Sequence, residues 1–420
     1  MKIHLVFNKV KLLVNNDILH SDSKRCFLPL NTFILTQSLN KRLLLEKFAK
    51  KTIMDTPSER FYGLDHLRAT AILLVLFYHY RAFTHPEWVN VYGRFGWTGV
   101  DLFFVLSGFL ISNQLFKEIK IHQKIDLRSF FANRFFRIIP PYLFTILLYF
   151  SFPFFRERES LSPLWKFLTF TQNYGLDVIN QGTFSHAWSL CIEEQFYLLL
   201  PFSLLLFLKT KTFKYLKIFI ALVLIFSILI RFISWHGFIV PHINTENFWK
   251  EWYMNIYYPT YTRLDSLAIG VLIGYLFQFS LKFKVLINTY GNLLFIAGVL
   301  LLGFSFWFCD EQASKNASVF GFTSVAISYG LIVMSAISHS SYISKSGLFI
   351  TNQLASLSYA IYLSHKGVIH MVQEGLKSLN IAIPDNIVLL ICLSACIVGA
   401  LFYRYAIEKP SEKLKRIVNR

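Results

Sequence analysis

Charged residues are scarce in this sequence, which argues against a soluble fold. Only 16% of the 420 residues are Asp, Glu, Lys or Arg, whereas 54% are hydrophobic and 44 are phenylalanine. Soluble domains carry nearer to about a quarter charged residues. Apolar runs of roughly 17–25 residues, the length that crosses a hydrocarbon core, recur along the chain. The composition therefore predicts an all-α, polytopic membrane protein.

Paired cysteines are also lacking. The sequence contains no CxxC pair, and its cysteines do not form an even extracellular set. Such patterns would be expected of a disulfide framework or a structural zinc site. The spacing indicates neither, and no metal site is predicted; the five cysteines are Cys26, Cys191, Cys309, Cys392 and Cys396.

The excess of positive charge, +18 at neutral pH, reflects topology rather than nucleic-acid binding. Ten of the 42 basic residues precede Met54, and most of the others fall in short loops between apolar runs. Short basic loops mark the cytoplasmic side of a membrane protein. The distribution predicts that both termini are cytoplasmic, and no nucleic-acid partner is expected.

We expect about ten spanning helices with short connections. No internal repeat is visible along the chain. The expected spans lie near residues 66–84, 97–116, 138–155, 188–208, 216–235, 259–280, 285–308, 319–338, 347–372 and 386–406.

The ends of the chain differ in character from the apolar body. Residues 1–57 form a basic extension without clear periodicity or a secretory signal, and Met54 is a candidate for the true start of synthesis. The membrane domain is expected over residues 58–412, followed by a short basic cytoplasmic tail, 413–420. This tail is too short for an appended soluble domain.

Ionisable residues inside the apolar runs are the functional candidates. Arg68 and His79 are eleven positions apart in the first span, so they lie on nearly the same helix face about 16 Å apart. Buried ionisable groups at this depth are costly and mark functional sites. An interhelical hydrogen bond for the histidine and a snorkelling arginine are the structural alternative.

The next two spans add further polar residues. Asp101 lies at the outer edge of the second span, where Ser107 and Gly108 allow close helix contact. Arg134 and Arg137 are three positions apart and share a helix face before the third span. Two guanidiniums so placed suit phosphate groups, although they could equally be topology anchors.

A motif in the fourth span places carboxylates near the candidate histidine. The segment "HAWSLCIEEQFYLLLP" holds Trp188 and the adjacent pair Glu193 and Glu194. Adjacent helix positions point about 100° apart, so at most one glutamate is expected to face His79 directly. A carboxylate there could orient the histidine and raise its basicity.

Two later spans complete the set of candidates. "TRLDSLAIG" contributes Arg263 and Asp265, for which an intramembrane ion pair is the structural alternative. "LSYAIYLSHKG" contributes Tyr362 and His365, which could instead serve as polar contacts between helices.

Taken in order, these motifs resemble the acyltransferase 3 family over roughly residues 58–412. The resemblance rests on R-x10-H, "GVDLFFVLSGFLI", R-x-x-R, "WSLCIEEQFY", "RLDSLAIG", "SYAIYLSH" and a closing "EKP". It implies a ten-helix, O-antigen acetylase-like enzyme of the bacterial inner membrane, which acylates surface sugars. Cys191 is a departure, because the family often has serine at that position. Many members also carry a soluble esterase-like domain after the last helix, and none is expected here.

The resemblance also implies roles for the candidate residues. Arg68 and His79 match the family's essential pair, Arg134 and Arg137 match the pair linked to the donor, and Glu193 and Glu194 match its acidic motif. The donor would be acyl-CoA, usually acetyl-CoA, and the acceptor a hydroxyl of a glycan or lipid-linked sugar; no tightly bound cofactor is expected.

A histidine suits this chemistry in two ways that the sequence leaves open. His79 could be the general base that deprotonates the attacking alcohol, or it could become acylated and relay the group. A transporter of lipid-linked sugars or protons is a rival, since intramembrane Arg, His and Glu would serve it too. Against that rival, no pair of Gly/Pro-broken spans occurs at matching places in two halves of the chain.

Overall fold

The computed structural model describes residues 61–380 and 383–418. The basic extension before Phe61, and with it the question of a start at Met54, lies outside these residues. The described part is helical, and its only strand-like pairing is an isolated bridge between Leu161 and Thr183.

Long helices occupy the ten ranges expected to span the membrane. They are α3 (Tyr62–Tyr80), α5 (Thr98–His122), α6 (Leu127–Ser151), α8 (Trp188–Lys209), α9 (Leu216–Ser234), α11 (Leu264–Phe279), α12 (Leu281–Phe308), α13 (Phe322–Ala336), α14 (Phe349–Ser378) and α15 (Asp385–Phe402). Short helices α4 (Trp88–Gly93), α7 (Leu164–Leu168) and α10 (Phe248–Trp252) lie in connections, and α16 (Lys409–Val418) closes the described chain.

Six helical segments of the described chain are long and apolar enough to cross a membrane. They contain α5, α8, α9, α12, α13 and α15. The protein is therefore a multi-pass membrane protein, while the count of ten spans and the side of each terminus stay predictions. Of the remaining long helices, α11 has only 16 residues, and α3, α6 and α14 carry the polar residues that line the cavities below.

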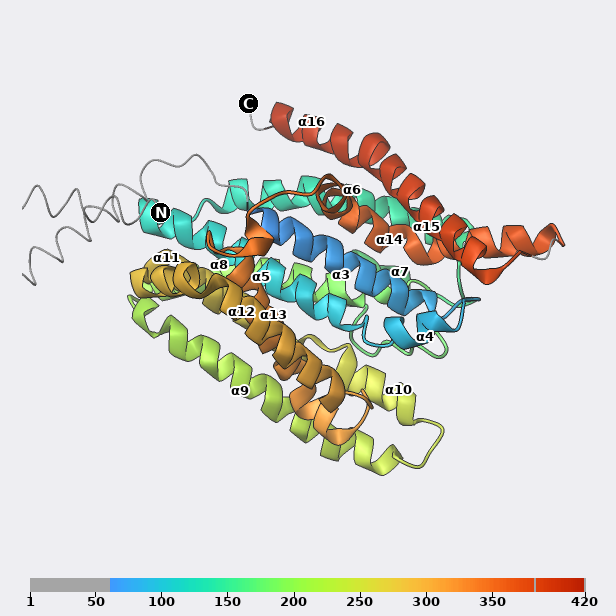
Figure 1. Cartoon of the computed structure of the whole chain (residues 1–420), viewed down its shortest axis with the longest axis horizontal. Coiled ribbons are helices and arrows are strands. Elements are labelled where there is room, and N and C mark those ends of the chain that lie inside the picture. The colour runs from blue at the N-terminus through green and yellow to red at the C-terminus, as the bar shows by residue number, and fades with distance from the viewer. Residues whose placement is uncertain (1–60, 381–382, 419–420) are drawn as a thin grey trace, which may run out of the picture. The chain divides into compact units, whose positions relative to one another are not determined.

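Burial separates central helices from those that face outward. The apolar segment containing α5 is 78% buried against the rest of the protein, whereas that of α12 is only 17% buried. Leucines and phenylalanines stand exposed along α9, α12 and α15. Such apolar outer faces are what a bilayer requires of its lipid-facing helices. In Figure 1, α3 and α5 run side by side at the centre, and α9 lies along the lower edge.

The contact between α5 and α11 depends on two glycines. A Cβ at Gly108 would collide with the carbonyl oxygen of Leu267, and one at Gly270 would collide with that of Val105. The close contact expected of Gly108 is thus confirmed. It fixes the position of Asp101 on α5 relative to Asp265 on α11.

Candidate active site

Two cavities lie at opposite ends of the central helices. The first, here called the arginine cavity, is about 260 Å³ in volume and lies toward the start of α3. The second, here called the histidine cavity, is about 420 Å³ in volume and lies toward the end of α3. Val100 of α5 lines both cavities. The polar residues of the arginine cavity are Arg68, Ser107, Gln114, Arg134, Arg137, Ser189, Glu193, Glu194, Tyr197, Ser358, Tyr359 and Tyr362.

Arg68 and His79 therefore do not share one groove. The eleven-residue spacing puts both on the inward side of α3, but Arg68 lines the arginine cavity and His79 the histidine cavity. The two residues are about 16 Å apart along the helix axis, which is far enough for each to line a different cavity.

The arginine cavity presents guanidinium groups without carboxylate partners. Arg134 donates from Nη2 to Oε1 of Gln114 over 3.3 Å, and its buried Nε has no partner. Among the described residues, neither Arg68 nor Arg137 has a carboxylate within ion-pair distance. Three guanidiniums with free donors in one cavity can bind a phosphorylated ligand bidentately.

Both glutamates of α8 line the arginine cavity rather than contacting His79. The hydroxyl of Tyr197 donates to Oε2 of Glu193 over 2.8 Å. Ser107, another expected site residue, lies 3.2 Å from the same tyrosine oxygen. Neither glutamate faces His79, and the residue that hydrogen-bonds to His79 is His365.

His79 and His365 form a hydrogen-bonded pair with a defined direction. Nδ1 of His365 lies 2.9 Å from the carbonyl oxygen of Tyr362 and 3.1 Å from that of Ile361. Carbonyl oxygens only accept, so this Nδ1 carries the proton, and Nε2 of the neutral ring is an acceptor. Nε2 lies 3.0 Å from Nδ1 of His79, which must therefore donate. The lone pair of His79 is then on Nε2, at the histidine cavity that the ring lines.

A third histidine, His186, completes the cluster and was not selected from the sequence. Its ring centroid lies 5.7 Å from that of His79 and 4.8 Å from that of His365. It follows Phe184, which adopts a left-handed φ of 53° and stacks on Tyr149 at 4.5 Å. A non-glycine residue in this conformation costs about 1–3 kcal/mol, so tight packing has to hold the turn that carries His186.

A thin polar layer separates the two cavities. The Tyr362 hydroxyl lines the arginine cavity and donates to the backbone oxygen of His186 over 2.7 Å. Because that proton is committed, the neighbouring Ser189 hydroxyl must donate to the tyrosine oxygen. Tyr362 is one turn before His365 on α14, so a single helix carries residues from both sides of this layer.

Aromatic and basic residues dominate the wall of the histidine cavity. Tyr253 and Tyr257 belong to a π-helical turn, Tyr253–Tyr257, whose wider winding brings them to the cavity together with Tyr258. Trp188 of α8 packs against them, with its ring centroid 5.0 Å from that of Tyr257. The remaining charged or titratable lining residues, apart from the histidines and these tyrosines, are Tyr78, Arg81, Arg158 and Lys366.

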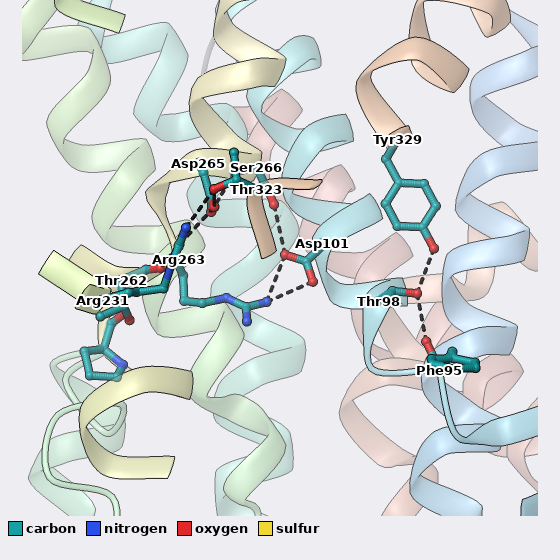
Figure 2. Close-up of polar contacts among 11 residues, drawn as sticks. Phe95, Thr98, Asp101, Arg231, Thr262, Arg263, Asp265, Ser266, Thr323 and Tyr329 are labelled. Carbon is teal, nitrogen blue, oxygen red and sulfur yellow. Dashed lines mark hydrogen bonds and ion pairs between the residues drawn. The ribbon is translucent and has the colours of Figure 1, made fainter. Parts of the chain in front are cut away.

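Three expected site residues lie in a buried ionic network and line neither cavity (Figure 2). Arg263 donates from Nη2 to both carboxylate oxygens of Asp101 at 2.9 Å, and Ser266 donates to the same group. Asp265 instead binds Nη1 of Arg231 at 2.9 Å. Arg263 and Asp265 of "TRLDSLAIG" thus each belong to a buried ion pair, as the structural alternative holds, and each pairs with a residue of a different helix.

Arg231 went unnoticed in the sequence because it stands in a very apolar run. It is completely buried and donates to the backbone oxygens of Val319 and Thr262 and to the Thr323 hydroxyl. The network therefore joins α5, α9, α11 and α13. Because every member is buried and linked to protein groups, its first role is structural.

The departure at Cys191 has a packing explanation. The cysteine is completely buried and lines neither cavity. Ser189, two residues earlier, is the hydroxyl that reaches the layer between the cavities. A small side chain is sufficient at position 191, so cysteine can replace serine there.

The chain is similar to known acyltransferases. The family described as an acyltransferase domain, acyltransferase 3, matches residues 61–404. O-acetyltransferase OatA of Staphylococcus aureus strain NCTC 8325 is 29% identical over 376 residues, as is a putative O-acetyltransferase of strain COL. Each match covers 84% of this chain but 57% of the relative, so the chain spans little more than half the length of these relatives.

No solved structure matches the chain significantly. The family match covers most of the chain and includes both cavities, the histidine pair and the two arginines of α6. On this evidence, the chain belongs to the acyltransferase 3 family.

Proposed function

We propose that the protein transfers an acyl group, in the first instance acetyl, from acyl-CoA to a hydroxyl of a cell-surface glycan or lipid-linked sugar. The observation that carries the proposal is the hydrogen-bonded pair of His79 and His365, in which His79 lines the histidine cavity. The family assignment and the O-acetyltransferase relatives supply the reaction class.

In this proposal the donor occupies the arginine cavity. Coenzyme A carries several phosphates, and Arg68, Arg134 and Arg137 offer free guanidinium donors for them. The positive-inside distribution of basic residues supports a cytoplasmic position for this end of the bundle, where acyl-CoA is present. The protein would lie in the bacterial plasma membrane.

The acceptor occupies the histidine cavity, and His79 is its general base. Nε2 of His79 takes the hydroxyl proton while the sugar oxygen attacks the thioester carbonyl. The new C–O bond forms as the C–S bond breaks, and the thiolate of coenzyme A leaves. His365 holds the His79 ring through Nδ1, in the way a second group orients a catalytic histidine in hydrolytic triads.

The layer of Tyr362 and Ser189 sets the geometric requirement of the reaction. The thioester in the arginine cavity must reach the ring of His79 beyond this layer, so the Tyr362 side chain must move for the donor to react. Because Tyr362 and His365 lie on the same helix, a small rotation of α14 would change both contacts together.

The direct test follows radiolabelled acetyl from acetyl-CoA into extracted glycans and glycolipids, using membranes with matched amounts of protein. A general base contributes about 10²–10⁴-fold, so His79→Gln should lose label by at least about a hundredfold. His122→Gln is the control, because His122 lies exposed at the end of α5 and lines neither cavity.

Equal label with His79→Gln and wild type would remove His79 from the chemistry. Label bound covalently to the wild-type protein at His79 would replace the general base by an acyl relay. If neither the wild type nor any variant transfers label, although acetyl-CoA binds to the protein, the result would contradict acyl transfer and favour transport.

A further inference from the structure

The histidine cavity combines three cations with six aromatic rings and has no carboxylate among its lining residues. The rings belong to Tyr78, Trp97, Trp188, Tyr253, Tyr257 and Tyr258, and the cations to Arg81, Arg158 and Lys366. The arginine cavity differs, because Glu193 and Glu194 offset its arginines. Lys366 is paired with Glu157, so the positive charge that a ligand of the histidine cavity meets comes from Arg81 and Arg158.

We propose that the histidine cavity selects an acceptor with a negative charge, a sugar bearing a phosphate, a diphosphate or a carboxylate, bound by Arg81 and Arg158. This inference rests on the proposed function, because it names the chemical class of the acceptor for the same site.

Two carboxylates close to the lining residues are already paired with lysines, one of which, Lys366, is itself a lining residue. Oε1 of Glu157 lies 2.7 Å from Nζ of Lys366, and this pair is almost completely buried. Asp177 precedes the lining residue Val178 and binds Lys250 at 3.0 Å. Partial burial opposes ionisation of Asp177, but hydrogen bonds from Asn180 and Lys250 hold its pKa below the usual range. Neither carboxylate is available to the two arginines.

Arg81 and Arg158 retain unused guanidinium donors. Arg81 donates from Nε to Oδ1 of Asn90 over 3.4 Å, and Arg158 donates from Nη1 to the backbone oxygen of Val178 over 2.8 Å. In the described part of the chain, neither has an ion-pair partner. Planar guanidiniums with free N–H groups are suited to phosphate or carboxylate oxygens.

The aromatic wall supplies the other half of a sugar site. Tyr253 and Tyr258 stack at 5.3 Å, and Trp188 lies 5.3 Å from Tyr258. Small-ligand sites typically combine such flat apolar surfaces with a few polar groups that fix orientation. Because His79 lines the same cavity, an anion held by the two arginines would leave the hydroxyl of the sugar free to approach Nε2.

The test measures binding and transfer separately on the purified full-length chain in lipid nanodiscs. Tryptophan fluorescence follows titration with glucose, glucose 1-phosphate and glucuronic acid, since Trp97 and Trp188 line the cavity. We expect glucose 1-phosphate or glucuronic acid to bind at least about tenfold more tightly than glucose, as charge-assisted hydrogen bonds require. Whichever of these two anionic sugars binds more tightly shows whether the cavity prefers a phosphate or a carboxylate.

The double variant Arg81→Gln, Arg158→Gln should abolish this preference while glucose binding changes little. Arg94→Gln is the matched control, because Arg94 is an exposed cation that pairs with Asp310 and lines neither cavity. Binding of coenzyme A, which uses the other cavity, verifies that each variant is folded.

Equal binding of the neutral and anionic sugars, no binding of any of them, or a preference that survives the double variant would overturn the inference. Acetyl transfer to native membrane glycans measures the proposed function independently. Transfer that persists without an anion preference removes only the inference. An intact anion preference without any acetyl transfer removes only the proposed function.

Discussion

The two buried aspartates should differ in their importance for stability, although each pairs with one arginine. Asp101→Ala leaves Arg263 without a hydrogen-bond acceptor, because its Nη2 binds only Asp101 and its Nε and Nη1 have none. Asp265→Ala leaves Arg231 with three other acceptors, the oxygens of Val319, Thr262 and Thr323. Arg231 therefore keeps most of its hydrogen bonds in Asp265→Ala, whereas Arg263 keeps none in Asp101→Ala.

The magnitude follows from the burial of the network. Removing one partner of a buried ion pair costs about 3–5 kcal/mol. All four side chains are completely buried, so both variants fall in this range. We expect Asp101→Ala near the upper end and Asp265→Ala near the lower end. The difference of about 2 kcal/mol corresponds to about thirtyfold in the unfolding equilibrium.

The assay is equilibrium unfolding of purified protein in mixed micelles with increasing SDS, followed by tryptophan fluorescence. The double variant Asp101→Leu, Arg263→Met should recover much of the stability lost in Asp101→Ala, because an apolar pair of similar volume no longer leaves a charge buried. Equal destabilisation by the two alanine variants, or greater loss with Asp265→Ala, would refute this reasoning.

Three further predictions concern the histidine pair, the donor and the helix contact. His365→Leu should lower kcat about tenfold or more and leave KM for acetyl-CoA unchanged. His365→Gln should restore part of kcat, because the glutamine oxygen can accept from His79. A change in KM without a change in kcat would contradict an orienting role. Arg137→Gln should raise KM for acetyl-CoA about tenfold but not KM for acetyl-pantetheine, which lacks the phosphates; an equal rise for both donors would count against phosphate binding. Gly270→Ala should destabilise the protein by about 1–3 kcal/mol in SDS unfolding, whereas Gly303→Ala, which meets open space, should be neutral.

The helical architecture follows from the sequence because long apolar runs have few other solutions in a membrane. Every expected span contains a long helix, since backbone groups in lipid must bond within the segment. Function also explains why some of the expected spans, α3 and α14 among them, are less apolar than the others. The charged residues of α3 and the polar residues of α14 line or adjoin the cavities, and they lower the mean hydropathy of these two helices.

Partners across the fold are what the sequence could not provide. Arg263 and Asp265 are neighbours in sequence, but Arg263 binds Asp101, 162 positions away. The spacing of Glu193 and Glu194 allows at most one of them to face His79, yet the packing of the helices puts both glutamates at the other cavity. Such choices depend on how helices pack, and no local pattern encodes that.

Two residues near the histidine pair, His186 and Lys366, were missed for a different reason. His186 lies just before the fourth span, in "SHAW", and reaches the cluster only because the strained turn at Phe184 directs the chain inward. Lys366 follows His365 in "SHKG" and is identified only by its ion pair with Glu157. In the sequence, the only indications of a site were that His186 adjoins an expected span and that Lys366 lies inside one.

The central claim is that an acyl group passes from the arginine cavity to an acceptor at His79, and sided proteoliposomes test it most directly. Labelled acetyl-CoA is supplied on one face, and a sugar acceptor of the kind that the binding experiment selects is supplied on the other. The account predicts labelled acceptor only when acetyl-CoA is on the cytoplasmic face, with at least about a hundredfold loss in His79→Gln. Transfer that requires donor and acceptor on the same face, or that persists in His79→Gln, would contradict it.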